Sequence, residues 1–442
     1  GSAEDLAHRA VQVLGKTSPA SLEAMAQDEL LAEFLQAFPV FPAWFERQMT
    51  DLRRRLLFAS ADDGIAGLLS KVAIQCHLNE YAWFEDRVET MLVDRFVESL
   101  ADLTPHQVMA LACYRPLARL PGADALLDRT WPGPVQDVLK EQIVAVREEQ
   151  KIGLALNSLT AVRAGVSEAV RSQYEENPYP RWRFVSQAAV VDHVHGRPFP
   201  KNPEVLVVGC GTGRHAIEAT LAIAGCRTLA VDLSRASLAY AVRKTGELGI
   251  DCIEYAHADL LELAGSGLQF DIVQSAGVLH HMEDPFEAAR KLCQLVKPGG
   301  LVALGLYSAR AREVLKPAKA LAKRYTPESV RALRRAILDA PEGDPVKAPA
   351  TMSRDFYATS GCRDLIMHVQ EHELRLADIQ RIVTENNLTF LGFHQFEGVK
   401  DTYRAMFPHD PQGLDLEAWD AFEAAHPSTF GRMFQFWAQA AA

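Results

Sequence analysis

Cysteine is sparse and scattered in this 442-residue sequence. The seven cysteines are odd in number and never form a CxxC pair. This spacing argues against a disulfide framework, a zinc finger and a cysteine-ligated iron–sulfur site. The pattern predicts reduced cysteines used as small buried side chains, as in a cytoplasmic protein.

Long apolar runs and an excess of positive charge are also lacking. The sequence has no run of 18 apolar residues, so it predicts no transmembrane span. Asp and Glu number 57 against 46 Lys and Arg, for a net charge of −11. Because nucleic-acid binding depends on basic surface, this balance argues against a nucleic-acid partner.

Helical repeats, which would indicate a solenoid, are absent as well. The first 165 residues have helical periodicity, whereas from about residue 200 short apolar runs alternate with helical segments. Such alternation is typical of an α/β fold with a parallel sheet. We therefore predict a helical N-terminal domain at 1–165, a connecting segment at 166–200, and an α/β domain at 201–442 with a helical insertion at 308–387.

Seven strands are predicted in the second half of the chain. They cover 204–208, 228–232, 252–259, 270–276, 301–308, 388–396 and 430–439. Helices are expected between them, including 235–248, 285–296 and about 414–425.

A glycine-rich turn follows the first of these strands. Gly209, Gly211 and Gly213 of GCGTG lack Cβ atoms, so the backbone can turn sharply and approach a ligand closely. Asp232 ends the next strand, where an acid reaches the two hydroxyls of an adenosine ribose. Asp259 ends the third strand, where a carboxylate can accept a hydrogen bond from the exocyclic amine of adenine. The weaker alternative is that both acids are solvated strand ends.

The glycine spacing is GxGxG, not the GxGxxG of dinucleotide sites. Together with Asp232, Asp259, VLHHMEDP (278–285) and LVKPGG (295–300), this segment resembles class I S-adenosylmethionine (SAM) dependent methyltransferases. The resemblance implies a Rossmann-like seven-stranded sheet whose last strand is antiparallel. It also implies SAM as cofactor and S-adenosylhomocysteine as product.

Further segments resemble a bacterial family of SAM methyltransferases often fused to tetratricopeptide repeats, which are absent here. They include 68–85, 171–182 (RSQYEENPYPRW), 227–244, 304–312 and 355–372. The resemblance supplies fold and cofactor but no acceptor. The cofactor-binding residues implied are Gly209, Cys210, Gly211, Thr212, Gly213, Asp232, Leu233, Asp259, Leu260 and Ala276.

One position departs from the superfamily pattern. Val207 stands where many members carry an acid that helps hold the methionine ammonium of SAM. Carbonyl groups near Gly209 or Ala276 are the expected substitutes.

The segment before the sheet resembles one that folds over the methionine end of SAM in related enzymes. That likeness implies that Arg181 pairs with the SAM carboxylate and that Tyr174 or Tyr179 lines the methyl channel. An equally weighted alternative is a turn that joins two domains and whose aromatic side chains only pack in the hydrophobic core.

Candidate catalytic residues lie after the fourth and fifth predicted strands. His281 follows the fourth strand, and its neutral imidazole could take a proton from an acceptor OH or NH. The favoured alternative for His281 is a structural loop. Tyr307, which ends the fifth strand, and Tyr357 are further candidates for the acceptor pocket.

His368, Glu371 and His372 form the pattern HxxEH. On a helix the two histidines would share a face, and the spacing occurs in some zinc peptidases. Zinc needs a third protein ligand and peptidase chemistry has no other support, so no metal is expected. We predict instead a lid over the acceptor pocket, with Glu371 or a histidine as general base. For each of these residues, and for Tyr307 and Tyr357, a helix that is amphipathic without any role in a site is an equally weighted alternative.

Residues 308–338 contain nine Lys or Arg and two Glu. They could steer an acidic substrate, although a solvated helix face is the favoured interpretation.

The predicted function is in-line transfer of the SAM methyl group to a protein or peptide side chain or to a small metabolite. The helical N-terminal region would cover the site, choose the acceptor or form a homodimer contact. A SAM-binding sensor without transferase activity is the alternative. Val207 favours the sensor, whereas the presence of the 177–182 and 368–372 segments favours the enzyme.

Overall fold

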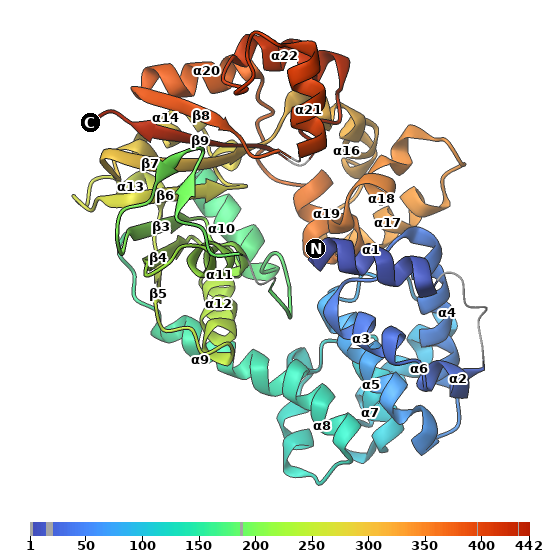
Figure 1. Ribbon diagram of the computed structural model, residues 1–442. Coiled ribbons are helices and arrows are strands. Elements are labelled where there is room, and N and C mark those ends of the chain that lie inside the picture. Colours follow the sequence, from blue (N-terminus) through green and yellow to red (C-terminus); the bar gives the residue numbers. More distant parts are fainter. Residues whose placement is uncertain (1–2, 15–20, 186–188, 396, 432) are drawn as a thin grey trace. The chain divides into compact units, whose positions relative to one another are not determined.

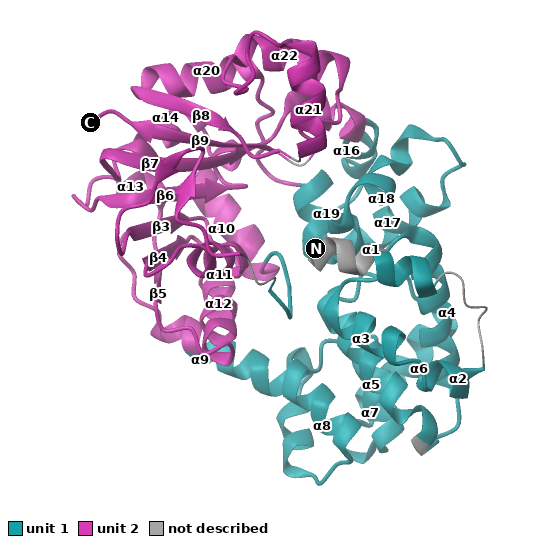
Figure 2. Ribbon diagram, viewed as in Figure 1, with its two compact units in different colours: residues 1–151, 179–186, 317–367 teal, residues 152–178, 187–316, 368–442 magenta. Residues whose placement is uncertain are grey.

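The computed structural model describes residues 3–14, 21–185, 189–395, 397–431 and 433–442. The chain forms two compact units, coloured separately in Figure 2. The helical unit comprises residues 1–151, 179–186 and 317–367, and the sheet unit comprises residues 152–178, 187–316 and 368–442. These units differ from the predicted domain ranges of 1–165, 166–200 and 201–442.

A seven-stranded sheet forms the centre of the sheet unit (Figure 1), in the order β5-β4-β3-β6-β7-β9-β8. Strands β3 to β7 pair in parallel, and β9 is antiparallel to both β7 and β8. The prediction of a Rossmann-like sheet with an antiparallel last strand is therefore confirmed. The strands are β3 (Glu204–Val208), β4 (Arg227–Asp232), β5 (Ile253–His257), β6 (Phe270–Ala276), β7 (Val296–Leu306), β8 (Leu388–Phe393) and β9 (Phe434–Ala440); β1 (His193–Val194) and β2 (Arg197–Pro198) form a separate two-stranded sheet.

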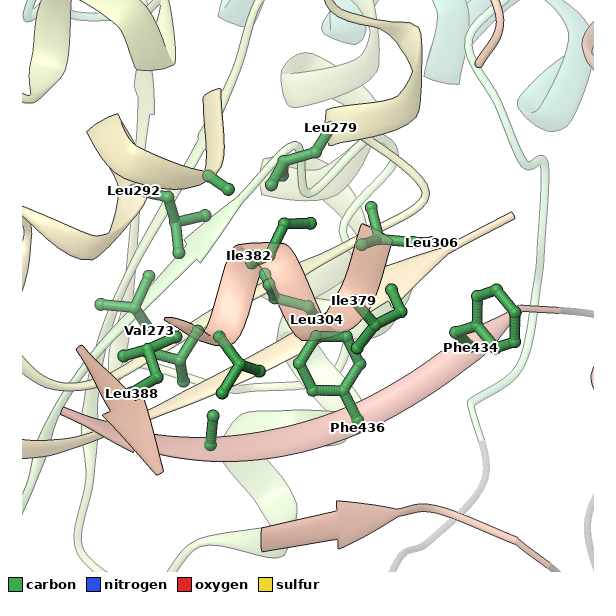
Figure 3. Close-up of a cluster of buried hydrophobic side chains, with 14 of the residues drawn as sticks. Val273, Leu279, Leu292, Leu304, Leu306, Ile379, Ile382, Leu388, Phe434 and Phe436 are labelled. Atoms are coloured by element: carbon green, nitrogen blue, oxygen red, sulfur yellow. The ribbon is translucent and has the colours of Figure 1, made fainter. Parts of the chain in front are cut away.

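Strand β3 shows why the sheet is covered on both faces. Alternate side chains of a strand point to opposite faces. Val205 and Val207 belong to one apolar cluster, and Leu206 and Val208 belong to another. Figure 3 shows the second cluster, in which Ile379 and Ile382 of one helix lie against Leu304 of β7. Burying each such side chain contributes about 1.5–3 kcal/mol.

Helices of the sheet unit supply the rest of both clusters. Ala216 of α11 and Leu238 of α12 pack against the Val205 face, whereas Leu292 of α14 packs on the opposite face. The helices are α10 (Val166–Glu176), α11 (Arg214–Ala222), α12 (Arg235–Glu247), α13 (Leu260–Leu263), α14 (Pro285–Cys293), α15 (Ala309–Arg312), α20 (Leu376–Glu385), α21 (Glu397–Met406) and α22 (Leu416–Ala425).

The N-terminus of α12 shows why residues 152–178 belong to the sheet unit. The carboxylate of Glu175 accepts hydrogen bonds from the amides of Arg235 (2.6 Å) and Ala236 (3.2 Å). An anion at a helix N-terminus is stabilised by the unpaired N–H groups there. The Arg235 guanidinium in turn donates to the carbonyl groups of Gly153 and Leu156.

The helical unit draws on three separated parts of the chain. Arg334 explains why residues 317–367 pack with the N-terminal helices, because its buried guanidinium contacts Glu46 at 2.6 Å and donates to the carbonyl of Ala82. The helices are α1 (Ala3–Leu14), α2 (Leu22–Ala26), α3 (Glu29–Ala37), α4 (Ala43–Phe58), α5 (Asp63–Leu78), α6 (Arg87–Glu98), α7 (Pro105–Ala112), α8 (Gly133–Leu139), α17 (Val330–Asp339), α18 (Ala348–Met352) and α19 (Thr359–Ile366), with α9 (Ala145–Ala155) and α16 (Lys316–Ala322) shared with the sheet unit.

Membrane-spanning helices were sought among the described residues. None of the helices found there has the length and apolar character needed to cross a bilayer.

Candidate active site

The strand order places a switch point between β3 and β6. From β3 the chain proceeds outward through β4 and β5, and then returns to the other side of β3 with β6. In open α/β sheets, ligands bind in the crevice outside the carboxyl ends of the strands at such a point. The glycine-rich turn begins here, and the amide of Gly209 donates to the carbonyl of Val231 at 2.8 Å.

Two glycines of this turn are required by the packing of the chain itself. Gly209 has a φ of +67°, and a Cβ added there would lie 2.1 Å from a Val278 methyl carbon. Gly213 has a φ of +85°, and its Cβ would lie 2.6 Å from the Cβ of Ala241 on α12. Any other side chain would therefore force the turn away from the sheet and from α12.

Asp232 links the ends of β3 and β4. Its Oδ2 accepts a hydrogen bond from the Gly211 amide at 2.8 Å, and its Oδ1 accepts from the Ser234 amide at 2.8 Å. Burial raises the pKa of the Asp232 carboxyl, and these two amides partly offset that effect. Each carboxylate oxygen has more than one lone pair, so both can accept a further bond. This arrangement fits a ribose diol at the carboxyl end of β4.

Asp259 has three structural partners that the sequence did not predict. Its carboxylate is buried and accepts from the amides of Leu261 (3.0 Å) and Arg163 (3.1 Å). The Asp259 amide donates to the Thr160 hydroxyl at 2.8 Å. Asp259 thus caps α13 and holds the 160–163 segment, and its contact with adenine stays a prediction.

The remaining predicted cofactor residues of the sheet unit follow the strand ends. Cys210, Thr212 and Leu260 are buried, whereas Leu233 and Ala276 are half-buried. Burial raises the pKa of the Cys210 thiol, which keeps it protonated. Val207 lies in an apolar cluster, so the structure offers no acid at that position.

Seven side chains of the sheet unit form a second group, called here the His–Tyr cluster. Its members follow β6, follow β7, or lie on α10 and the 368–371 segment: Tyr174, His280, His281, Tyr307, Arg312, His368 and Glu371. The carboxyl ends of β6 and β7 meet at the edge of the sheet that holds the glycine turn, because these strands are parallel to β3.

Tyr307 is stacked between a histidine and an arginine. The His280 ring lies 3.8 Å from the Tyr307 ring, and the Arg312 guanidinium carbon lies 3.7 Å from it. Arg312 also binds both oxygens of Glu371, at 2.9 and 2.8 Å. The predicted general base Glu371 is therefore held in a buried bidentate ion pair with Arg312.

His281 and His368 stack with their ring centroids 3.6 Å apart. The Nδ1 of His368 accepts from the Gln370 amide at 3.1 Å, and its Nε2 lies 3.2 Å from the Tyr174 hydroxyl. The predicted candidates Tyr174, His281, Tyr307, His368 and Glu371 are thus brought together in one group.

The HxxEH pattern does not lie on a helix, contrary to the geometry considered for it. Residues 367–373 are irregular, and His372 does not share a helix face with His368. The amide of Leu374 donates to the Tyr307 carbonyl at 2.9 Å, and the amide of His372 donates to the His280 carbonyl at 2.7 Å. These contacts tie the segment to the residues that follow β6 and β7.

Three predicted site residues belong to the helical unit. Arg181 lies 3.5 Å from Glu80 and 3.3 Å from His77 Nε2. Tyr357 is buried, and its hydroxyl donates to the Ala350 carbonyl at 2.6 Å. Tyr179 belongs to the same unit. Their proposed contacts with SAM or acceptor stay predictions.

The basic stretch at 308–338 is largely paired with acids. Arg310 contacts Asp420 at 2.6 Å and Glu423 at 3.0 Å, and ion pairs of Arg312 and Arg334 are described above. These ion pairs weaken the positive electrostatic potential of the basic stretch, so they argue against a role in steering an acidic substrate.

Sequence reasoning missed three polar residues of the sheet unit. His280 was noted only within the segment VLHHMEDP, and Arg312 only within the basic stretch. Gln274, a buried residue of β6, lies 3.1 Å from His215 Nε2. A polar residue within an apolar strand pattern was the available signal for Gln274.

Comparisons with known proteins locate the similarity in the sheet unit. Residues 206–304 match the family model described as a methyltransferase domain. An uncharacterised protein of Synechococcus sp. is 25% identical over 280 residues, covering 56% of this chain and 66% of that protein. A ubiquinone biosynthesis O-methyltransferase of Aromatoleum aromaticum is 36% identical over 99 residues, covering 22% of this chain and 41% of that enzyme.

Among solved structures, PKMT2 from Rickettsia typhi is similar with a TM-score of 0.43 and 15% identity, over 55% of this chain and 49% of that one. The chain spans less than half the length of the Aromatoleum enzyme. The match at 206–304 contains the glycine turn, Asp232 and both histidines after β6. Residues 206–304 therefore match a methyltransferase domain.

Proposed function

We propose that the whole chain is a SAM-dependent methyltransferase that acts on a protein or peptide side chain or on a small metabolite. The observation that carries the proposal is the hydrogen bond between Gly211 and Asp232 at the β3–β6 switch point. It combines a glycine turn, which permits close approach, with a carboxylate suited to a ribose diol.

Asp232 would hold the ribose, and the turn from Gly209 to Gly213 would contact the methionine portion of the cofactor. SAM, when bound, supplies a methyl group already activated by its sulfonium charge. The chain then has to align the acceptor and exclude water, because alignment alone lowers such a barrier substantially. The His–Tyr cluster is proposed to line the acceptor side, with His281 as the candidate proton acceptor.

A SAM-binding sensor without transferase activity is the second candidate. Val207 supports it, since the superfamily acid is missing there. The group formed by Tyr174, His281 and His368 supports the enzyme, since a sensor has no need of histidines at the acceptor side.

We further propose a cytoplasmic protein, supported by seven free cysteines. The net charge of −11 supports an acceptor other than nucleic acid. The helical unit is proposed to select the acceptor or to mediate a homodimer, which light scattering of the purified chain would test.

The deciding experiment uses methyl-tritiated SAM, the purified chain and a bacterial lysate, with the products separated by size. Label in macromolecules that protease removes would indicate a protein acceptor, and label in small molecules would indicate a metabolite. Asp232→Ala should strongly reduce either signal when SAM is limiting, whereas Asp251→Ala, which changes an exposed aspartate before β5, should not. Bound SAM without any transfer would favour the sensor.

A further inference from the structure

Gln274 is a buried polar residue within the apolar run of β6. Its side chain is only 6% exposed, and burying an amide is costly unless it is hydrogen-bonded. The Oε1 of Gln274 lies 3.1 Å from Nε2 of His215. Because a carbonyl oxygen can only accept, the imidazole N–H donates this bond. A carbonyl oxygen has two lone pairs, so Oε1 can accept a second hydrogen bond.

This polar pair lies beside the position that lacks an acid. In the parallel pairing of β3 with β6, Gln274 is the register partner of Val207. Register partners on neighbouring parallel strands point to the same face of the sheet. His215 is the second residue of α11, the helix whose Ala216 packs on that face. The amide of Gln274 therefore stands next to the apolar side chain of Val207, at the first turn of α11.

The pair also borders the turn proposed to contact the methionine portion of SAM. Gln274 comes two residues before the carboxyl end of β6, and His215 comes two residues after Gly213. The carboxyl ends of β3 and β6 flank the switch point, where open α/β sheets bind ligands. The methionine portion carries an ammonium group, which has donors only and therefore needs acceptors.

The two nearest alternatives on these elements are not suited to an ammonium group. Val207 is apolar and belongs to a hydrophobic cluster. Glu218, an acid of α11, is engaged by Arg214 at 3.1 Å. Burial lowers the pKa of His215 below its usual value, so its ring is neutral near pH 7 and places no positive charge beside the amide of Gln274.

We propose that Oε1 of Gln274 accepts a hydrogen bond from the methionine ammonium group of SAM, and that His215 is a positioning residue that orients this amide. The pair on β6 and α11 thereby takes the place of the acid that β3 lacks. An ammonium group has three hydrogens, so carbonyl groups near Gly209 or Ala276 can accept the others. The inference rests on the proposed function and assigns the side chain that recognises one group of its cofactor.

Ligands with and without the ammonium group test this inference. The purified chain is titrated by calorimetry with SAM and with 5′-methylthioadenosine, which contains the adenosine and sulfur of the cofactor but lacks its amino-acid part. Gln274→Leu removes the acceptor at nearly the same side-chain size. We expect the SAM affinity of this variant to fall roughly 10-fold to 100-fold, as for a lost hydrogen bond to a charged group. Its affinity for 5′-methylthioadenosine should be unchanged.

Gln380→Leu is the matched control, because it changes an exposed glutamine of α20, and it should bind both ligands like the wild type. An equal loss for both ligands, or no loss for either, would overturn the role of Gln274 and leave the proposed function intact. A wild-type chain that does not bind SAM would overturn both. Gln274→Asn keeps an amide on a shorter side chain and should show the same selective loss, so it decides if Gln274→Leu does not fold.

Discussion

The Gly211 amide and the Asp232 carboxylate are joined by a hydrogen bond of 2.8 Å. The acid proposed to bind the ribose therefore also fixes the turn proposed to contact the rest of the cofactor. Ser234, the N-cap of α12, donates its amide to the other oxygen. One side chain thus connects the ends of two strands and the start of a helix.

Asp232 is the most direct test of the cofactor site. Asp232→Ala removes a charged acceptor from the ribose and releases the Gly211 amide. Hydrogen bonds to charged groups contribute about 1.5–3 kcal/mol, so SAM affinity should fall about 10-fold to 100-fold in titration calorimetry. Asp251→Ala should bind SAM like the wild type. Equal affinity of Asp232→Ala and wild type would show that SAM binds elsewhere.

Gly213→Ala tests the steric account of the glycine turn. The new Cβ would meet the Cβ of Ala241 at 2.6 Å, in a left-handed conformation. We expect a loss of about 1–3 kcal/mol in the free energy of unfolding, measured by urea denaturation. Gly246→Ala on α12 is the matched control, since nothing lies within 4 Å of its Cβ. This control should be neutral or stabilise by up to about 1 kcal/mol, because alanine favours the helix.

The buried pair of Arg312 and Glu371 offers a double-mutant cycle. Arg312→Met alone leaves Glu371 buried without its bidentate partner, which should cost about 3–5 kcal/mol of stability. Adding Glu371→Leu removes the stranded charge, so the double variant should recover much of that loss. Urea unfolding of the four proteins gives the coupling energy. If the two single losses simply add, the pair does not act as a unit.

The strands were predictable because short runs of apolar residues in the local sequence indicate buried strands. EVLVV at 204–208 and FDIVQSA at 270–276 match β3 and β6 at both ends. Strands covered on both faces are continuous apolar runs, and glycines and aspartates mark their carboxyl ends. The glycine turn and Asp232 could be placed for the same reason.

Contacts between residues far apart in the sequence determine how the helices group and how the acceptor side of the site is built. Sequence periodicity gives no information about such contacts. Arg334 and Glu46 are 288 positions apart, and their ion pair joins residues 317–367 to the N-terminal helices. The 368–372 segment was considered as a helix, but its neighbours Tyr307 and Leu374 pair their backbones instead. Tertiary hydrogen bonds override local preference in so short a segment.

The pH dependence of stability tests the buried state of His280. Burial, with the nearby groups His281, Arg312, His368 and His372, holds the pKa of His280 well below its usual value. Above about pH 7.5 the ring is neutral in both folded and unfolded chains, so it contributes no pH dependence. As the pH falls below that value, the unfolded chain takes up a proton that the folded chain does not, and the free energy of unfolding decreases.

His280→Phe should remove this share of the acid sensitivity. As the pH falls below about 6.5, the wild type should lose more stability than the variant in urea titrations. A residual slope is expected in both, because burial also lowers the pKa of His215 and of His106. Parallel curves for His280→Phe and wild type would mean that His280 takes up its proton in the folded chain, and its Nδ1 could then no longer accept from the Tyr307 amide.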